Sequence, residues 1–147
     1  MSTLFDLAQR ICRGDSLPPP VARLIGFTLM SIAPGQARIA FEAGAQHTNP
    51  MGTLHGGMLC DIADAAIGTA YASTLGEGET FTTLELKINF LKPVWQARLH
   101  AIGRVVTHGR TVGLVECDII DIDANEALVA RATSTCMTLR GDQGHGR

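Results

Sequence analysis

A histidine-glycine-glycine triplet opens an apolar stretch that also contains two acidic residues. His55, Gly56 and Gly57 precede a run whose hydrophobic spacing predicts a long helix, and Asp61 and Asp64 lie within that run. The first turn of a helix presents unpaired N–H groups and about half a positive charge. Because glycine has no Cβ, a carbonyl group can approach these amides closely. A nearby carboxylate could then activate water, or attack the carbonyl carbon itself.

The two aspartates are expected to differ in role. Asp61 precedes Asp64 by three residues, so the two carboxylates are neighbours on the helix surface. Partial burial and the proximity of a like charge both tend to raise the pKa of one carboxyl group, which favours a usable general base. We interpret Asp61 as a solvated or salt-bridged helix residue. A structural aspartate in so apolar a helix would need a dedicated partner, so Asp64 is the better candidate for chemistry.

The spacing of the glycines and Asp64 has a geometric consequence. Gly57 and Asp64 are seven residues apart, which is roughly 10 Å along a helix that rises roughly 1.5 Å per residue. One carbonyl group cannot easily touch both ends of that distance. An antiparallel helix from a second copy would bring its own Asp64 beside Gly57 of this chain. The spacing therefore predicts a site shared between two subunits.

The chain around this helix is predicted to form one antiparallel sheet. Strands at 27–33 and 36–42 flank Pro34-Gly35, which is a hairpin signal. After the helix, long strand-like runs joined by short turns favour an antiparallel meander. These four runs are residues 80–91, 97–107, 111–122 and 126–139. One sheet packed on one buried helix, an α+β architecture, is the economical arrangement.

Residues 80–91 alternate with a period of two, which assigns side chains to the two faces of a strand. One face would carry Leu84, Leu86, Ile88 and Phe90, and the other Thr83, Glu85, Lys87 and Asn89.

The long helix has an apolar stripe at helical spacing and a second side of small residues. The stripe consists of Leu59, Ile62, Ala63, Ala66, Ile67, Ala70 and Tyr71. The second side carries Ala65, Gly68 and Ala72 together with the two aspartates. The sheet can cover the stripe, and we expect the helix of another subunit to cover the second side.

The chain divides into three segments. Residues 1–24 are predicted to form a short amphipathic helix and a proline-rich connection, because the prolines within 16–20 stop a helix. Residues 25–139 form the single domain, and residues 140–147 are predicted to be a disordered tail.

Composition excludes several classes of function. Among 147 residues, 46% are hydrophobic and 18% charged, which describes one globular domain with some apolar surface available for subunit contact. The net charge of -2 offers no basic field for nucleic acid or anionic lipid. No apolar run approaches the roughly 18 residues that span a membrane, and we expect a cytoplasmic protein. The isolated cysteines predict neither a metal site nor a disulfide framework; they are Cys12, Cys60, Cys117 and Cys136.

The pattern Asn49-x-x-Gly52-x-x-His55-Gly56-Gly57, followed nine residues after the histidine by Asp64, resembles the hotdog-fold acyl-CoA thioesterases. The PaaI-like branch, of the phenylacetate-pathway type, is the most similar. Residues 82–94 and 108–119 also resemble that family, and the resemblance covers roughly 25–139. It implies a hotdog fold, in which an antiparallel sheet wraps a long central helix. It further implies a homodimer, often paired into a homotetramer as a dimer of dimers, with a hydrolase site at each dimer interface.

The resemblance also implies roles for individual residues. Asp64 would be the catalytic carboxylate, as general base or as nucleophile, and the Gly57 amide would polarise the thioester carbonyl. Asn49 would help to position the substrate, and the Thr83 hydroxyl would orient water or the acid. His55 is interpreted first as a helix-start residue, with substrate contact and general base as alternatives. Gly56 would give the substrate room to approach.

Coenzyme A would arrive as part of the substrate, so no separate cofactor is implied. Its phosphates need cations near the mouth of the site. Lys92, His108, Arg110 and Arg140 lie at predicted strand ends or turns, and we favour Arg110 among them. Phe90, at the end of its strand, is a further candidate for substrate contact.

Two alternatives keep the same fold. A non-catalytic acyl-CoA sensor would bind the ester without releasing a thiol, and a hotdog acyl dehydratase would need a paired histidine and carboxylate. The acyl group stays open among aryl, arylacetyl and medium-chain types, because one sequence does not disclose which side chains line the pocket.

Overall fold

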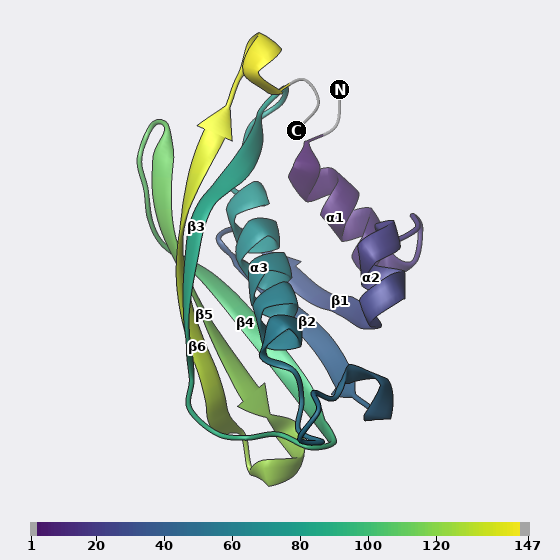
Figure 1. Ribbon diagram of the computed structural model, residues 1–147. Coiled ribbons are helices and arrows are strands. Elements are labelled where there is room, and N and C mark those ends of the chain that lie inside the picture. Colours follow the sequence, from purple (N-terminus) through teal and green to yellow (C-terminus); the bar gives the residue numbers. More distant parts are fainter. Residues whose placement is uncertain (1–2, 145–147) are drawn as a thin grey trace.

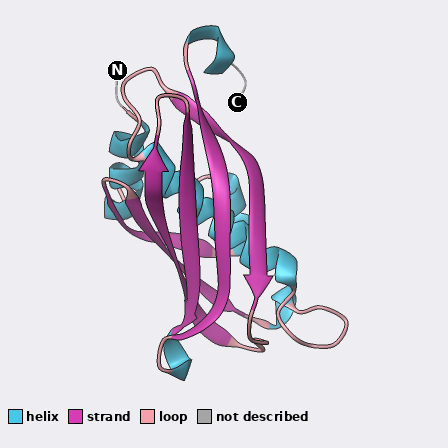
Figure 2. Cartoon of the chain, turned by 90° about the vertical axis from the view of Figure 1, so that its left-hand side faces the viewer, coloured by secondary structure: helices cyan, strands magenta, loops and turns pink. Residues whose placement is uncertain are grey.

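The computed structural model describes residues 3–144, in which six strands form one antiparallel sheet that curves around a long helix (Figure 1). The elements in chain order are α1 (Leu4–Arg13), α2 (Pro20–Ile25), β1 (Phe27–Ala33), β2 (Gln36–Ala43), α3 (Gly56–Ala72), β3 (Thr80–Phe90), β4 (Ala97–His108), β5 (Val112–Asp121) and β6 (Ala127–Leu139). The long strands lie next to one another with the helices behind them (Figure 2). The predicted α+β architecture is confirmed. Within the described part of the chain, no helix is long and apolar enough to cross a membrane.

The order of the strands differs from the predicted meander. The sheet order is β1-β2-β4-β5-β6-β3, so β3 pairs with β6 rather than with β4, its neighbour along the chain. The reason is that β4 already has a partner on each side: β2 pairs with it from Gln36↔Arg104 to Ala43↔Ala97, and β5 occupies its other edge. As a result β3 lies at one edge of the sheet of this chain.

Helix α3 lies against the inner face of the sheet, and its predicted apolar stripe is buried. A Cβ at Gly103 on β4 would overlap the carbonyl oxygen of Ala66, so only glycine lets the helix come this close. Near the end of α3, the hydroxyls of Tyr71 and Thr138 lie 2.7 Å apart and share a hydrogen bond, although both residues are buried. The sheet therefore holds α3 in a fixed position.

The N-terminal segment differs from the prediction in how its first helix ends. Helix α1 begins with a capping box between Thr3 and Asp6 and ends at Gly14, whose φ of 80° suits a left-handed cap. Gly14, and not the prolines of 16–20, therefore stops the helix. Pro20 then occupies the first turn of a second helix, α2, where its missing N–H costs nothing.

Part of the second side of α3 faces another segment of the same chain. Helix α1 faces Ala65, Gly68 and Ala72 across a groove, where we expected the helix of another subunit. The first half of the same side, with Asp61 half-buried and Asp64 exposed, stays open in the single chain.

Part of the predicted disordered tail has a defined conformation. Gly141–Gly144 form a 3₁₀ turn, in which the Gln143 N–H donates to the Arg140 carbonyl at 3.2 Å. The rest of the tail, 145–147, lies outside the described residues.

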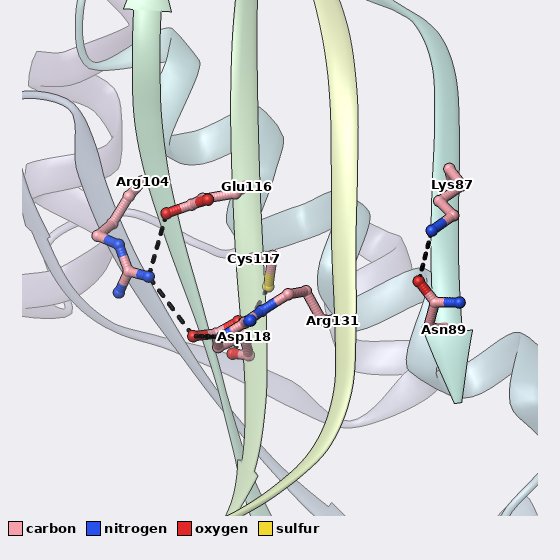
Figure 3. Close-up of polar contacts among 7 residues, drawn as sticks. All are labelled: Lys87, Asn89, Arg104, Glu116, Cys117, Asp118 and Arg131. Carbon is pink, nitrogen blue, oxygen red and sulfur yellow. Dashed lines mark hydrogen bonds and ion pairs between the residues drawn. The ribbon is translucent and has the colours of Figure 1, made fainter. Parts of the chain in front are cut away.

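The outer face of the sheet carries charged side chains that pair with one another (Figure 3). Arg131 donates to Asp118 at 2.7 Å, and this hydrogen bond holds the pKa of Asp118 below its ordinary value. Arg104 lies between Glu116 and Asp118, at 3.3 and 3.5 Å. These charges satisfy one another, so the candidates for chemistry are on the inner side, around α3.

Candidate active site

Asp64 and Thr83 lie next to each other, although they are far apart in the sequence. The Thr83 hydroxyl donates to a carboxylate oxygen of Asp64 at 3.3 Å, which joins the middle of α3 to β3. One side of the Asp64 side chain is exposed to solvent, and its other side is partly buried against the apolar lining of a groove. That burial raises the pKa of Asp64, the hydrogen bond from Thr83 lowers it, and the nearby charge of Asp61 raises it again. The net effect is a more basic carboxylate than an ordinary aspartate.

A β-bulge aims Thr83 at Asp64. In the pairing of β3 with β6, Thr83 lies opposite Cys136 and Glu85 opposite Thr135, which leaves Leu84 as an extra residue. The period-two alternation that we predicted for 80–91 is therefore wrong at this point. Strict alternation would have placed Thr83 on the face opposite to Leu86. The extra residue lets both point toward α3.

Two hydrogen bonds satisfy the backbone groups that the bulge leaves out of the ladder. The hydroxyl of Ser134, which is fully buried, donates to the Glu85 carbonyl at 2.6 Å. The Glu85 carboxylate in turn accepts the Thr135 N–H at 2.6 Å. These contacts fix the backbone next to Thr83, and sequence reasoning missed them. The visible signal was the shift of apolar residues from odd positions, at Phe81, to even positions from Leu84 onward.

The first turn of α3 has the open amides that the sequence suggested. His55 occupies the cap position, as predicted, and its side chain makes no capping hydrogen bond. The Met58 N–H donates to the His55 carbonyl at 3.0 Å. The N–H groups of Gly56 and Gly57 precede any intrahelical acceptor, so they are available to a ligand. The His55 ring lies beside Gly57, because a Cβ there would be 3.0 Å from it.

Asn49, Gly56, Phe90 and Lys92 line a groove of about 360 Å³ at this end of α3. The side-chain oxygen Oδ1 of Asn49 accepts the N–H groups of Met51 and Thr53, and the side-chain amide Nδ2 donates to the Thr53 hydroxyl at 2.7 Å. Asn49 is thus held in a turn. One of its two amide hydrogens is still available for a ligand.

The Phe90 ring lies over Gly56, because a Cβ at Gly56 would be 3.0 Å from it. The end of β3 thus meets the start of α3.

His108 and Arg110 lie near the opposite end of α3. The His108 ring stacks on Tyr71, with centroids 4.7 Å apart, and the Arg110 carbonyl accepts a hydrogen bond from Arg140. Arg140 also forms an ion pair with Glu79 at 2.6 Å. Since α3 has 17 residues, its length of roughly 25 Å separates these cations from Lys92. One chain therefore does not bring the predicted phosphate ligands together.

Among residues 3–144, no three His, Cys, Asp or Glu side chains are grouped in a way that could hold a metal ion.

Comparisons with known proteins agree on one family. The model of the thioesterase superfamily matches residues 51–128, which include Asp64, Thr83 and the glycines. Human acyl-coenzyme A thioesterase 13 is 28% identical over 137 residues, which cover 92% of this chain and 96% of that protein. The crystal structure of a phenylacetic acid degradation-related protein from Ralstonia eutropha is 30% identical, with a TM-score of 0.79, and covers 88% of this chain and 98% of its own. The PaaI protein of E. coli aligns with a TM-score of 0.81 over 95% of this chain and 98% of its own, and at 24% identity it shows the fold alone, the predicted hotdog fold.

The contacts around the bulge predict the effect of Ser134→Ala. Loss of the buried Ser134 hydroxyl leaves the Glu85 carbonyl without its donor, so we expect the free energy of unfolding to fall by about 1–3 kcal/mol. Urea unfolding at a fixed protein concentration measures this change. Thr133→Ala, one residue away on the opposite face of β6, is the matched control and should change stability by less than about 0.5 kcal/mol. Equal losses in both variants would contradict the role given to Ser134.

Proposed function

The chain belongs to the thioesterase superfamily and is a thioester hydrolase, and we propose that its substrate is an acyl-CoA, which it cleaves to a carboxylic acid and free coenzyme A. The observation that carries this proposal is the Asp64–Thr83 pair, in which a carboxylate of raised pKa lies beside an apolar groove. Such a carboxylate can act on a thioester, while the groove takes up the apolar acyl group. A cytoplasmic location is part of the same proposal.

Asp64 supplies the reactive carboxylate in either of two routes. As a general base, it takes a proton from water while the water oxygen bonds to the thioester carbonyl carbon. As a nucleophile, it attacks that carbon itself and forms an anhydride, which water then opens. In both routes the carbon–sulfur bond breaks and coenzyme A leaves as its thiolate. Thr83 holds the carboxylate, or the water, in line for attack.

The carbonyl oxygen needs hydrogen-bond donors where its negative charge develops. We assign this role to the Gly57 amide, with Asn49 helping to position the ester and Gly56 adding a second open N–H. Gly57 and Asp64 are roughly 10 Å apart along one helix, so the two groups that meet at one ester belong to different copies. His55 occupies the N-terminal cap position of α3, close to Gly57.

A homodimer would satisfy this requirement. The free edge of β3 can pair with β3 of a second copy, and the open side of α3 can then lie against an antiparallel α3. In such a dimer the two α3 helices run in opposite directions, so the start of one lies beside the end of the other. Lys92 of one copy would then lie at the same end as His108 and Arg110 of the other. Cations from both copies could therefore hold the coenzyme A phosphates, with Phe90 beside the thioester, and a dimer of dimers is compatible with this arrangement.

Asp64→Asn tests the proposed function directly. Wild-type protein should release a thiol from a panel of acyl-CoA esters, and the variant should lose at least about 100-fold in kcat/KM, because an amide can neither take a proton nor attack. Asp61→Asn, three residues away, is the matched control and should keep activity within about threefold.

The Asp64→Asn variant should also stay folded. Burial raises the pKa of Asp64, so ionised Asp64 opposes folding at every pH above its unfolded-state pKa, and replacing it by a neutral amide should leave Tm unchanged or higher at pH 7. Substantial turnover by Asp64→Asn would contradict the assignment. Binding of the esters by wild-type protein without thiol release would favour the sensor alternative.

Thr83→Val should change the pH dependence of the reaction. Asp64 must be ionised to act, so kcat/KM falls as the pH drops through its pKa. The hydrogen bond from Thr83 lowers that pKa. Its loss therefore moves the acid limb of the pH profile to higher pH, with about a tenfold lower kcat. Thr83→Ser keeps the hydroxyl and should leave the acid limb of the pH profile in place. If the acid limb of Thr83→Val does not move, or moves to lower pH, the proposed effect of the Thr83 hydrogen bond on Asp64 is wrong.

A further inference from the structure

A groove of about 350 Å³ runs between α1 and the C-terminal half of α3, and Asp64 and Thr83 are part of its lining. Figure 1 shows α1 beside the upper half of α3, with α2 next to it. The groove thus begins at the proposed reacting groups and extends under the N-terminal helix.

The lining of this groove is apolar apart from three side chains. Asp64 and Thr83 belong to the proposed reaction site, and the hydroxyl of Thr69 already donates to the Ala65 carbonyl at 2.7 Å. No lysine, arginine, histidine, asparagine or glutamine is among the lining residues that the structure describes. A hydroxyl or charge carried deep into the groove would therefore lose its water without gaining a partner.

The two walls of the groove differ in the size of their side chains. The α3 wall consists of Ala65, Gly68 and Ala72, next to Asp64 and Thr69. A Cβ at Gly68 would lie 3.0 Å from the Phe81 ring, so the glycine leaves that ring in place beside the helix. The opposite wall has long branched side chains from α1, among them Leu7 and Ile11. Leu7 and Ile11 are therefore the large α1 side chains that limit the space facing α3, while residues of α2 and β1 close the rest of the groove.

We propose that the apolar tail of the acyl group lies in this groove, and that Leu7 and Ile11 of α1 determine which tails fit. The inference rests on the proposed function. It selects plain hydrocarbon tails, aliphatic or aryl, over tails that carry a distal hydroxyl or carboxylate. It also places the selectivity in a helix outside residues 51–128, the segment that matches the family. Members of the family can then share the reacting groups and differ in the acyl group that they accept.

The test is a series of straight-chain acyl-CoA esters of increasing length, with free coenzyme A as the readout. Each methylene that enters the groove should raise kcat/KM about fourfold until the groove is full, which corresponds to about 0.8 kcal/mol at about 1.36 kcal/mol per tenfold. An ester with a terminal hydroxyl on a tail of the preferred length should be tenfold to a hundredfold poorer than the plain ester.

Variants on α1 separate the groove from the reacting groups. Ile11→Trp should lower kcat/KM for the longest good substrates at least about tenfold and leave acetyl- and butyryl-CoA within about twofold. Leu7→Ala should move the preferred length upward. Arg10→Trp places the same bulk on the exposed side of α1 and should leave the length profile unchanged. Retained activity on short esters shows that each variant is folded and has an intact reaction site.

The outcomes distinguish this inference from the function on which it rests. If wild-type protein hydrolyses the series but Ile11→Trp and Arg10→Trp give the same profile, or the terminal hydroxyl has no effect, the groove does not hold the tail. If no ester releases coenzyme A, the proposed function itself is overturned, and this inference with it. A selective loss on long esters in Ile11→Trp alone supports it.

Discussion

The rise of an α-helix fixes the distance between the two groups that the proposed reaction needs. Seven residues separate Gly57 from Asp64, and a helix cannot bring them nearer than roughly 10 Å along its axis. Each group suits its part: the amides at the start of α3 have no capping partner, and burial makes Asp64 more basic. Within one chain, a substrate carbonyl group held by the Gly57 amide would lie out of reach of Asp64. The proposed reaction would therefore require two copies of the chain to associate.

Contacts with the sheet fix the position of α3 and bring Thr83 to Asp64. Gly103 lets α3 lie close against β4, and the Tyr71–Thr138 hydrogen bond fixes its far end. One extra residue in β3 then turns Thr83 toward Asp64. Because the buried hydroxyl of Ser134 satisfies the backbone of the bulge, the irregular strand does not leave a polar group without a partner. The contact to Asp64 depends on these features of the fold.

Much of the local structure could be predicted from the sequence, because its signals are local. The apolar stripe of α3 and the alternating strands appear within a residue or two of their predicted bounds. The position of β3 beside β6 could not be predicted, since no local pattern specifies which distant strands pair. The stop at Gly14 and the bulge at Leu84 each left a trace in the sequence: a glycine after a basic last turn, and a change in the parity of apolar residues.

The candidate site also has features that the sequence predicted and features that it did not. The sequence selected Asp64 and Thr83, and the structure places them in contact, while their roles stay predictions. The groove under α1 was not foreseeable, because it forms between segments far apart in the chain. The separation of Lys92 from His108 and Arg110 likewise became visible only when the strand ends were placed on opposite sides of the molecule.

The activity of mixed dimers tests the shared site most directly. Differently tagged Asp64→Asn and Gly57→Val chains, each inactive as a homodimer, are co-expressed, and the hybrid is purified through both tags. If the carboxylate and the amide at each ester come from different copies, one site of the hybrid carries both substitutions and the other carries neither. The hybrid should then show about half of the wild-type thioesterase activity per dimer. A hybrid as inactive as its parents, together with half activity when the doubly substituted chain is paired with wild type, would show that each site is built within a single chain.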